Sequence, residues 1–268
     1  VPSSIRINAV LEGIGRRLLS AIRKNFDEPM KARVEGKVRE GTPIFANGTG
    51  YIQVINWNEL LEVARDSGAE LQLAVRTGDF VHPSVAIGYW SEQPDEKWSD
   101  EVRDCFALGD ARTPTQDLHF MMDELVEIGL RALSPGINDP FTAISALHWI
   151  GAATAELGKR DLNWSVGKPD EDGRHPLLPM ADDFSHYVRR GFGTIRSAVA
   201  TSPPAATVML DSLESTAATI TDPVRHKVVR DEAHQLMRQA KTCLVGPDLE
   251  QVEAHYALFC KRVADGPE

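Results

Sequence analysis

The chain has 268 residues, of which 42% are hydrophobic and 25% charged, which is typical of a globular protein and not of a largely disordered one. Its net charge of −10 disfavours binding to DNA or RNA, because an acidic surface repels phosphates. The three cysteines are widely spaced and form no CxxC pair, which excludes a disulfide framework and favours buried or inert thiols in a reducing compartment.

The first predicted element is an amphipathic helix from about Ser4 to Asn25. Its apolar residues recur at steps of three and four and so form one stripe, made of Ile7, Leu11, Ile14, Leu18 and Ile22. Residues 1–24 carry a net charge of +4, so the remaining residues sum to −14. This basic start leaves two interpretations open: a segment next to the cytoplasmic face of a membrane, or an ordinary helix with a solvated basic side.

Membrane and export signals are absent from the sequence itself. No stretch approaches the roughly 18 apolar residues that span a bilayer, and the start lacks the charged-then-apolar pattern of a signal peptide. Because the chain opens at Val1 and not at methionine, we expect it to be a fragment, or a processed or trimmed chain.

A small β-rich module is predicted between residues 37 and 92. β-prone alternation, glycine turns and one short amphipathic stretch give a βαββ-like order, with strands at Tyr51–Ile55, Leu71–Val75 and around 80–87, and a helix at 56–66. The glycines at positions 48 and 50 are turn residues in this interpretation, since a G-T-G without a following GK[ST] is a very weak phosphate-loop signal.

From Asp100 onward the pattern is helical, apart from a Pro-, Gly- and acid-rich loop between residues 161 and 180. Helices are expected at 100–108, 114–133, 140–159, 182–200, 203–220, 223–244 and 248–264. The predicted fold class is therefore α+β, a small β-rich module joined to a mostly α-helical domain. The expected domains are a juxtamembrane helix and linker (1–36), the β-rich module (37–92) and the helical domain (93–268).

The run from Arg112 to Thr142 is the most informative stretch of the sequence. Thr113 is a candidate N-cap, Pro114 suits a first helical position, and Gln116 would complete a capping box. Ser134-Pro135-Gly136 stops this helix, and the next begins at once with Asn138 or Asp139 as its cap and proline after it. The two helices therefore form a hairpin with a very short connection.

Five polar side chains gather at the corner of this hairpin: Arg131, Ser134, Asn138, Asp139 and Thr142. The start of the second helix offers free backbone N–H groups and a partial positive charge, so it could hold an anion. Asp139 as the cap would occupy that place itself, and the same Asp-Pro pattern recurs at Asp222-Pro223 without any hint of function. A structural corner and a ligand site both remain open.

The run from Arg131 to Ala143, RALSPGINDPFTA, preceded by Arg112-Thr113 and Gln116-Asp117, resembles the hallmark of the DUF2254 family of predicted bacterial membrane proteins. The stretches Gly50–Gln53 and Gly78–Val81 resemble that family in the same order and spacing. In that family transmembrane helices precede a soluble domain like this one. The resemblance implies that this chain is the soluble part of a membrane protein, favours the juxtamembrane interpretation of the first helix, and carries no established activity. His82-Pro83-Ser84 departs from the Gly-containing turn expected there.

We therefore expect the cytoplasmic domain of a bacterial integral membrane protein, with a sensory, assembly or gating role. The candidate ligand-binding residues are Arg112, Thr113, Gln116, Asp117, Arg131, Ser134, Asn138, Asp139 and Thr142. The expected partners are its own transmembrane region and the membrane surface, through residues 1–24, and further copies of the chain. No cofactor or metal is expected, since no histidine has a ligand spacing such as HExxH.

Two alternatives remain. One is an enzyme that acts on a phosphate- or carboxylate-bearing small molecule at the same site, where arginine, acid and base would suit such substrates. The other makes the β-rich module a partner-binding adaptor and the helical part its scaffold.

Overall fold

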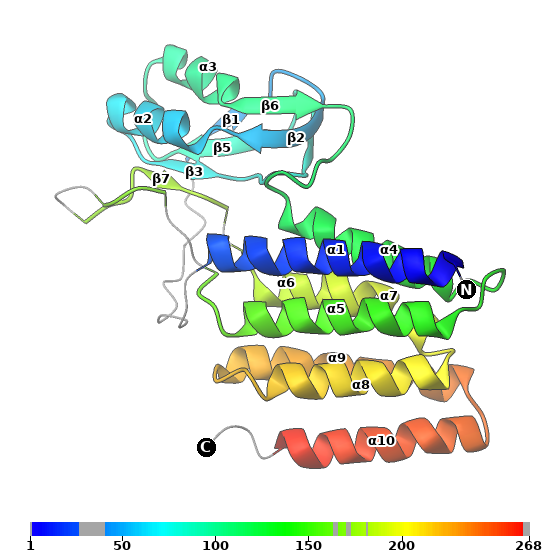
Figure 1. The fold of residues 1–268 in the computed structure, drawn as a ribbon. Coiled ribbons are helices and arrows are strands. Elements are labelled where there is room, and N and C mark those ends of the chain that lie inside the picture. Colours follow the sequence, from blue (N-terminus) through cyan, green and yellow to red (C-terminus); the bar gives the residue numbers. More distant parts are fainter. Residues whose placement is uncertain (1, 27–40, 163–165, 170–172, 181, 265–268) are drawn as a thin grey trace. The chain divides into compact units, whose positions relative to one another are not determined.

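The computed structural model describes residues 2–26, 41–162, 166–169, 173–180 and 182–264 of an α+β protein (Figure 1). The chain divides into two compact units. The helical unit comprises Val1–Lys31, Met121–Leu162 and Asp183–Glu268, and the β unit comprises Ala32–Phe120 and Asn163–Asp182. Each unit is therefore assembled from segments that lie far apart in the sequence.

The β unit contains two small sheets and two helices. One sheet has the strand order β1 (Thr42–Phe45), β5 (Ala86–Trp90), β3 (Leu71–Leu73) and β7 (Leu177–Leu178), and the other has the order β4 (Phe80–Val81), β2 (Gly50–Ile55) and β6 (Phe106–Gly109). The helices are α2 (Trp57–Ser67) and α3 (Glu96–Asp104). Apolar residues of both sheets and both helices form one core, which includes the fully buried Trp90.

The predicted strands at 51–55 and 71–75 are present, the second ending at Leu73. The strand expected around 80–87 is divided into β4 and β5, which belong to different sheets, and β1, β6 and β7 were not predicted. The helix expected at 100–108 ends at Asp104, because Phe106–Gly109 pairs antiparallel with β2. β7 lies within the predicted loop, where it adds to β3 in parallel. Both strands are very short and depend on a partner strand distant in sequence, so their own residues carry little local signal.

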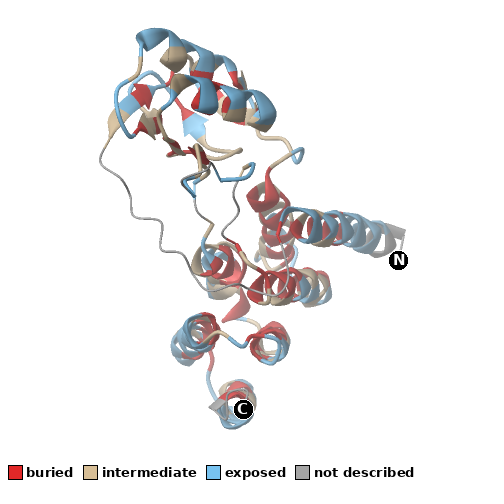
Figure 2. Cartoon of the chain, turned by 90° about the vertical axis from the view of Figure 1, so that its left-hand side faces the viewer, coloured by how far each residue is buried: buried red, intermediate tan, exposed pale blue. Residues whose placement is uncertain are grey.

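The helical unit contains α1 (Pro2–Asn25), most of α4 (Leu118–Ala132) and α5 (Pro140–Gly158). The C-terminal part adds α6 (Phe184–Val188), the π-helical segment η1 (Arg189–Gly193), α7 (Thr194–Val199), α8 (Pro203–Ala217), α9 (Pro223–Cys243) and α10 (Pro247–Ala264). α1 packs on α5, α5 on α8, and α8 on α10, an order that Figure 1 shows as successive layers. Figure 2 shows that buried residues line the facing sides of these helices.

The helix predicted at 182–200 begins at Phe184 and is not a regular α-helix throughout. It is divided into α6, η1 and α7, and the π-helical segment contains the Gly-Phe-Gly of residues 191–193. A Cβ on Gly191 would lie 3.0 Å from Cγ2 of Ile150, so glycine permits the close packing of this segment against α5.

α1 and α5 lie side by side and run parallel. Gly15 faces Trp149, where a Cβ would overlap the indole ring, and further along Arg23 meets Glu156. Of the predicted apolar stripe, the residues from Leu11 onward are buried, whereas Ile7 is 37% exposed. The packed part of α1 therefore begins about one turn after Ile7.

At the C-terminal end of α5, buried charged side chains connect α5 with the ends of α1 and α9. Nε and Nη2 of Arg160 donate to Oε1 of Glu156, and its Nη1 donates to the carbonyl of Phe26 at 2.7 Å. Nη1 of Arg225 donates to the carbonyls of Leu157, Gly158 and Arg160. These bonds satisfy carbonyl groups that the end of a helix leaves without partners.

None of the helices in the described part of the chain is both long and apolar enough to cross a bilayer.

Candidate functional site

The nine candidate residues from the sequence fall into two groups, one in each unit. The β-unit group consists of Arg112, Thr113, Gln116 and Asp117, and the helical-unit group consists of Arg131, Ser134, Asn138, Asp139 and Thr142. The structure brings together residues within each group, and the two groups are described separately.

The β-unit group centres on a buried ion pair. Nε and Nη2 of Arg112 lie 2.8 Å and 2.7 Å from Oδ2 of Asp117, and the Asp117 side chain is only 2% exposed. The other carboxylate oxygen accepts a hydrogen bond from the backbone N–H of Phe120. Asp117 therefore caps α4, which begins at Leu118.

This start of α4 corrects the predicted capping box. Thr113 and Pro114 precede the helix, and the Gln116 side chain bonds to β2 instead, accepting from the N–H of Ile55 and donating to its carbonyl. The amide of Gln53 also binds the carbonyl of Ala111. These long-range bonds hold the segment outside the helix. The hydroxyl oxygen of Thr113 is buried without a hydrogen-bond partner among the described residues.

The turn between β3 and β4 fits closely against the same ion pair. Gly78 has φ +90°, and a Cβ there would overlap the carboxylate of Asp117, so both the backbone conformation and the space require glycine. The neighbouring Thr77 hydroxyl donates to the carbonyl of Gln116 at 2.8 Å. Two of the stretches that resemble the DUF2254 pattern are thus in direct contact: Gly78–Val81 and the segment that carries Arg112-Thr113 and Gln116-Asp117.

A second ionic contact in the β unit involves Asp182. Nη1 of Arg76 lies 2.8 Å from Oδ1 of Asp182, and Nε2 of His119 lies 3.6 Å from the same oxygen. The chain leaves the β unit after Phe120 and again after Asp182. These contacts hold the two exits together within the β unit.

In the helical unit, Asp139 caps α5 as one of the two predicted alternatives. Its Oδ1 accepts from the N–H of Thr142, and its Oδ2 accepts from the Thr142 hydroxyl at 2.6 Å. These hydrogen bonds lower the pKa of Asp139 below its usual value, because they favour the ionised carboxylate. Thr142 is buried, so this pair forms a closed cap.

The remaining polar residues of the corner are used locally or face solvent. Nη2 of Arg131 lies 2.6 Å from Oε1 of Glu127, and both side chains are 70% exposed. The Ser134 hydroxyl donates to the carbonyl of Arg131. Asn138 is exposed and has φ +47°, a conformation that asparagine tolerates better than most residues.

Sequence reasoning missed two apolar residues at the same corner. Phe141 is 77% exposed and Ile137 is 55% exposed, although side chains of this kind are usually buried. The sequence contained a sign of this exposure. Phe141 directly follows Asp139 and Pro140, and its position in the helical repeat lies outside the apolar face of α5.

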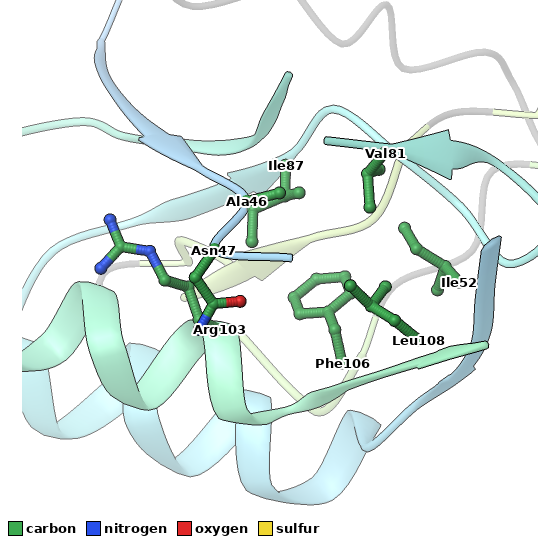
Figure 3. A pocket seen from close by; sticks show the side chains of 8 residues that line it. All are labelled: Ala46, Asn47, Ile52, Val81, Ile87, Arg103, Phe106 and Leu108. Carbon is green, nitrogen blue, oxygen red and sulfur yellow. The ribbon is translucent and has the colours of Figure 1, made fainter. Parts of the chain in front are cut away.

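A small hollow in the β unit is lined by Ala46, Asn47, Ile52, Val81, Ile87, Arg103, Phe106 and Leu108 (Figure 3). Its apolar side chains come from both sheets, and Arg103 at its edge donates to the carbonyl of Phe45. The space suits about one water molecule, far less than the several hundred Å³ of a small-molecule pocket. This hollow is a gap in the core.

The residues that the structure describes contain no cluster of three or more His, Cys, Asp or Glu side chains able to hold a metal ion. Burial raises the pKa of Cys105 to about 12, so its thiol stays protonated at neutral pH. Cys243 and Cys260 are exposed and free.

Comparison with known proteins gives a family and relatives. A family model described as "Predicted membrane protein (DUF2254)" matches residues 1–215. Uncharacterized proteins of Mycobacterium bovis and Mycobacterium tuberculosis are 28% identical over 249 residues, which cover 89% of this chain and 48% of each relative. The chain thus spans about half the length of the curated relatives it matches. No solved structure matches the chain.

Proposed function

The chain belongs to the DUF2254 family of predicted membrane proteins, and on that premise we propose that it is a cytoplasmic sensory, assembly or gating domain of a bacterial membrane protein. In this proposal α1 is the element nearest the membrane, and its own transmembrane region and the membrane surface are its partners. The observation that carries the proposal is the two-sided character of α1, which is packed on one side and basic on the other.

The packed side makes α1 part of the helical unit. Its apolar residues from Leu11 to Ile22 are buried, and Gly15 brings its backbone against Trp149 of α5. Because side chains interlock there, α1 cannot shift along its axis without moving α5 or breaking the contact. A displacement imposed on α1 would therefore reach the corner that begins α5, which is the property that a sensory or gating element needs.

The outward side of α1 carries the charge that suits a cytoplasmic membrane surface. Arg16, Arg17 and Arg23 remain 72%, 55% and 59% exposed although each pairs with an acid, and Arg6 and Lys24 are also exposed. Basic side chains close to a membrane are attracted by anionic headgroups, and they favour the cytoplasmic side.

The proposal also includes ligand binding at the corner between α4 and α5, residues 131–142. The corner offers an exposed arginine, Arg131, and the N-terminal end of α5, where an anion is favoured. A ligand would have to displace Asp139 from its cap or bind beside it. The enzyme alternative has weaker support there, because the carboxylate that would act as a base already accepts two hydrogen bonds from Thr142.

Fractionation of the protein from its own cells tests the proposal. We expect it to sediment with membranes and to resist a carbonate wash. Protease should cut within these 268 residues in inside-out vesicles, and should leave them intact in right-side-out vesicles. Recovery in the soluble fraction would contradict the membrane role, and cleavage only from the outer face would contradict the cytoplasmic side.

The ligand proposal needs its own measurement. Titration of the chain with inorganic phosphate, followed by NMR shifts of the backbone N–H groups of residues 138, 139, 141 and 142, should give a saturable change. Asp222 caps α9 by accepting from the N–H of Val224, so the amides at the start of that helix are the matched control. Equal responses at both helix starts would indicate nonspecific ion binding.

A further inference from the structure

The parallel packing of α1 and α5 places two chain segments at the same end of the helical unit. Gly15 faces Trp149, Arg23 meets Glu156, and Arg160 binds the carbonyl of Phe26. These pairs are all separated by nearly the same number of residues. Counting back at equal rise along both helices, Ile7 is level with Phe141. Figure 1 shows the start of α1 and the α4–α5 connection at the same end.

Exposed apolar side chains are concentrated at this end. Phe141 and Ile137 project from the corner at 77% and 55% exposure, and Val10 and Ile7 on α1 are 53% and 37% exposed. We call these four residues the apolar end. Six other large apolar side chains of the described chain are 37–82% exposed, and the three of them in the helical unit are separated along the chain: Val224 at the start of α9, Val245 after its end, and Leu258 in α10.

The corner that carries Ile137 and Phe141 is held by a closed set of hydrogen bonds. The N–H groups of Ile137 and Asn138 donate to the carbonyl of Ser134, and the N–H of Asp139 donates to the carbonyl of Ala132 at 2.8 Å. The Asp139–Thr142 cap fixes the first turn of α5. The two apolar side chains are therefore presented from a preorganised corner, which reduces the entropy lost on binding.

Two exposed arginines lie at the apolar end. Arg6 is next to Ile7 on α1, and Arg131 at the end of α4 stays 70% exposed although it pairs with Glu127, so further N–H groups of its guanidinium can bind a phosphate. Asp139, the other acid at this corner, accepts from Thr142. Long arginine side chains beside an aromatic and an aliphatic residue are the arrangement that meets the headgroup and acyl layers of a bilayer together.

We propose that the apolar end seats on the surface of a lipid bilayer that contains anionic lipid. Ile137 and Phe141 enter the boundary between headgroups and acyl chains, and Arg6 and Arg131 bind lipid phosphates. A fluid lipid surface can surround each exposed side chain of the corner separately. A protein partner would instead have to match a large continuous area, which these few side chains do not provide. The inference rests on the proposed membrane role and assigns the contact surface that this role leaves open.

Vesicle flotation of the 268-residue chain tests the inference, with vesicles of phosphatidylcholine alone or with added phosphatidylglycerol. The chain should bind the mixed vesicles more tightly. The double variant Ile137→Ser, Phe141→Ser should lose at least about tenfold in affinity, since each buried apolar side chain contributes enough for such a loss. Arg6→Gln with Arg131→Gln should reduce the preference for phosphatidylglycerol, and an unchanged preference would contradict the assigned phosphate contacts.

The matched control is Val224→Ser with Leu258→Ser, which removes two apolar side chains of 60% and 48% exposure elsewhere on the helical unit. This variant should bind vesicles like the unchanged chain. Circular dichroism and melting confirm that each variant is folded. Equal loss in both double variants, or no loss in the corner variant, would overturn the inference.

A depth measurement distinguishes the bilayer from other occupants. Tryptophan fluorescence of Phe141→Trp should be quenched by brominated lipid beyond the unchanged chain, and that of Val224→Trp should not. Vesicle binding without this quenching would overturn the inference while leaving the membrane role intact. If the corner variant instead lowers the mass of an oligomer in light scattering, a second copy covers the corner and the inference fails. Failed membrane fractionation would remove the premise itself.

Discussion

The two ends of the α1–α5 pair are built in opposite ways. At the end near Glu156, charged side chains are buried and join α1, α5 and α9 through several hydrogen bonds. At the end near Phe141, the polar groups bond only within the corner, and the apolar side chains face outward. One end is closed by the protein itself, and the other presents apolar surface outward.

This difference suggests that one end stabilises the fold and the other end makes an external contact. Glu156 is buried and binds Arg160 and Arg23, so a change there leaves buried charge without compensation. Phe141 contributes little to the core because it is 77% exposed, so the folded state does not explain an aromatic residue at this position. Substitutions near Glu156 should therefore lower the free energy of unfolding more than substitutions near Phe141. For vesicle affinity the order is reversed, and substitutions near Phe141 should have the larger effect.

The largest effect is expected for Glu156→Gln. It removes the charge that faces Arg160, and the free energy of unfolding of the helical unit should fall by about 3 kcal/mol. Urea unfolding followed by the helical circular dichroism signal measures the change. Glu127→Gln at the corner is the control, because its exposed pair with Arg131 should contribute no more than about 0.5 kcal/mol. Equal losses would break the comparison.

Lowering the pH should gradually remove the contribution of the Glu156 carboxylate to the free energy of unfolding. Burial raises the pKa of Glu156, but hydrogen bonds from Arg23, Arg160 and Lys159 outweigh it and lower the pKa to about 2. Because the pKa of Glu156 in the folded state lies below its usual value of 4.5, the stabilisation is complete above pH 4.5 and is lost as the pH falls toward about 2. The total is up to about 3 kcal/mol, and Glu156→Gln should flatten this part of the stability profile.

Asp139→Ala should have an intermediate effect. The substitution removes the cap of α5, including its bonds to the N–H and hydroxyl of Thr142, and should lower the free energy of unfolding by about 1 kcal/mol. Thermal melting provides the measurement. Asp139→Asn, which retains a capping oxygen, should recover most of the loss. A cap that could be removed without cost would show that long-range packing alone fixes the corner.

The smallest effect on stability is expected for Ile137→Ser with Phe141→Ser. Both side chains are largely exposed, so the free energy of unfolding should change by no more than about 0.5 kcal/mol. The same variant should show the large loss in vesicle binding given above. A loss of several kcal/mol in urea would mean that these side chains support the fold, and would remove the contrast between the two ends.

The candidate site shows where local sequence rules hold and where they fail. Asp139-Pro140 and Asp222-Pro223 cap α5 and α9 as their pattern predicts, because both partners of the cap lie within one turn. Thr113-Pro114 has similar local features, yet α4 begins at Leu118. Hydrogen bonds between Gln116 and Ile55 outweigh the local preference for a helix start at Thr113. The sequence near residue 113 does not predict these bonds, because Ile55 is distant in the chain.

The sequence by itself determined the helices of the C-terminal half, a cap at Asn138 or Asp139, the strands β2 and β3 of the β unit and the family resemblance, because each depends on residues within a few positions of one another. Only the tertiary structure decided the pairing of β6 with β2, the fit of Gly78 against Asp117, the parallel packing of α1 on α5, and the exposure of Phe141. These features join residues that are tens to more than a hundred positions apart. Periodicity and capping rules carry no information at such separations, since packing and long-range hydrogen bonds select among local conformations of similar free energy.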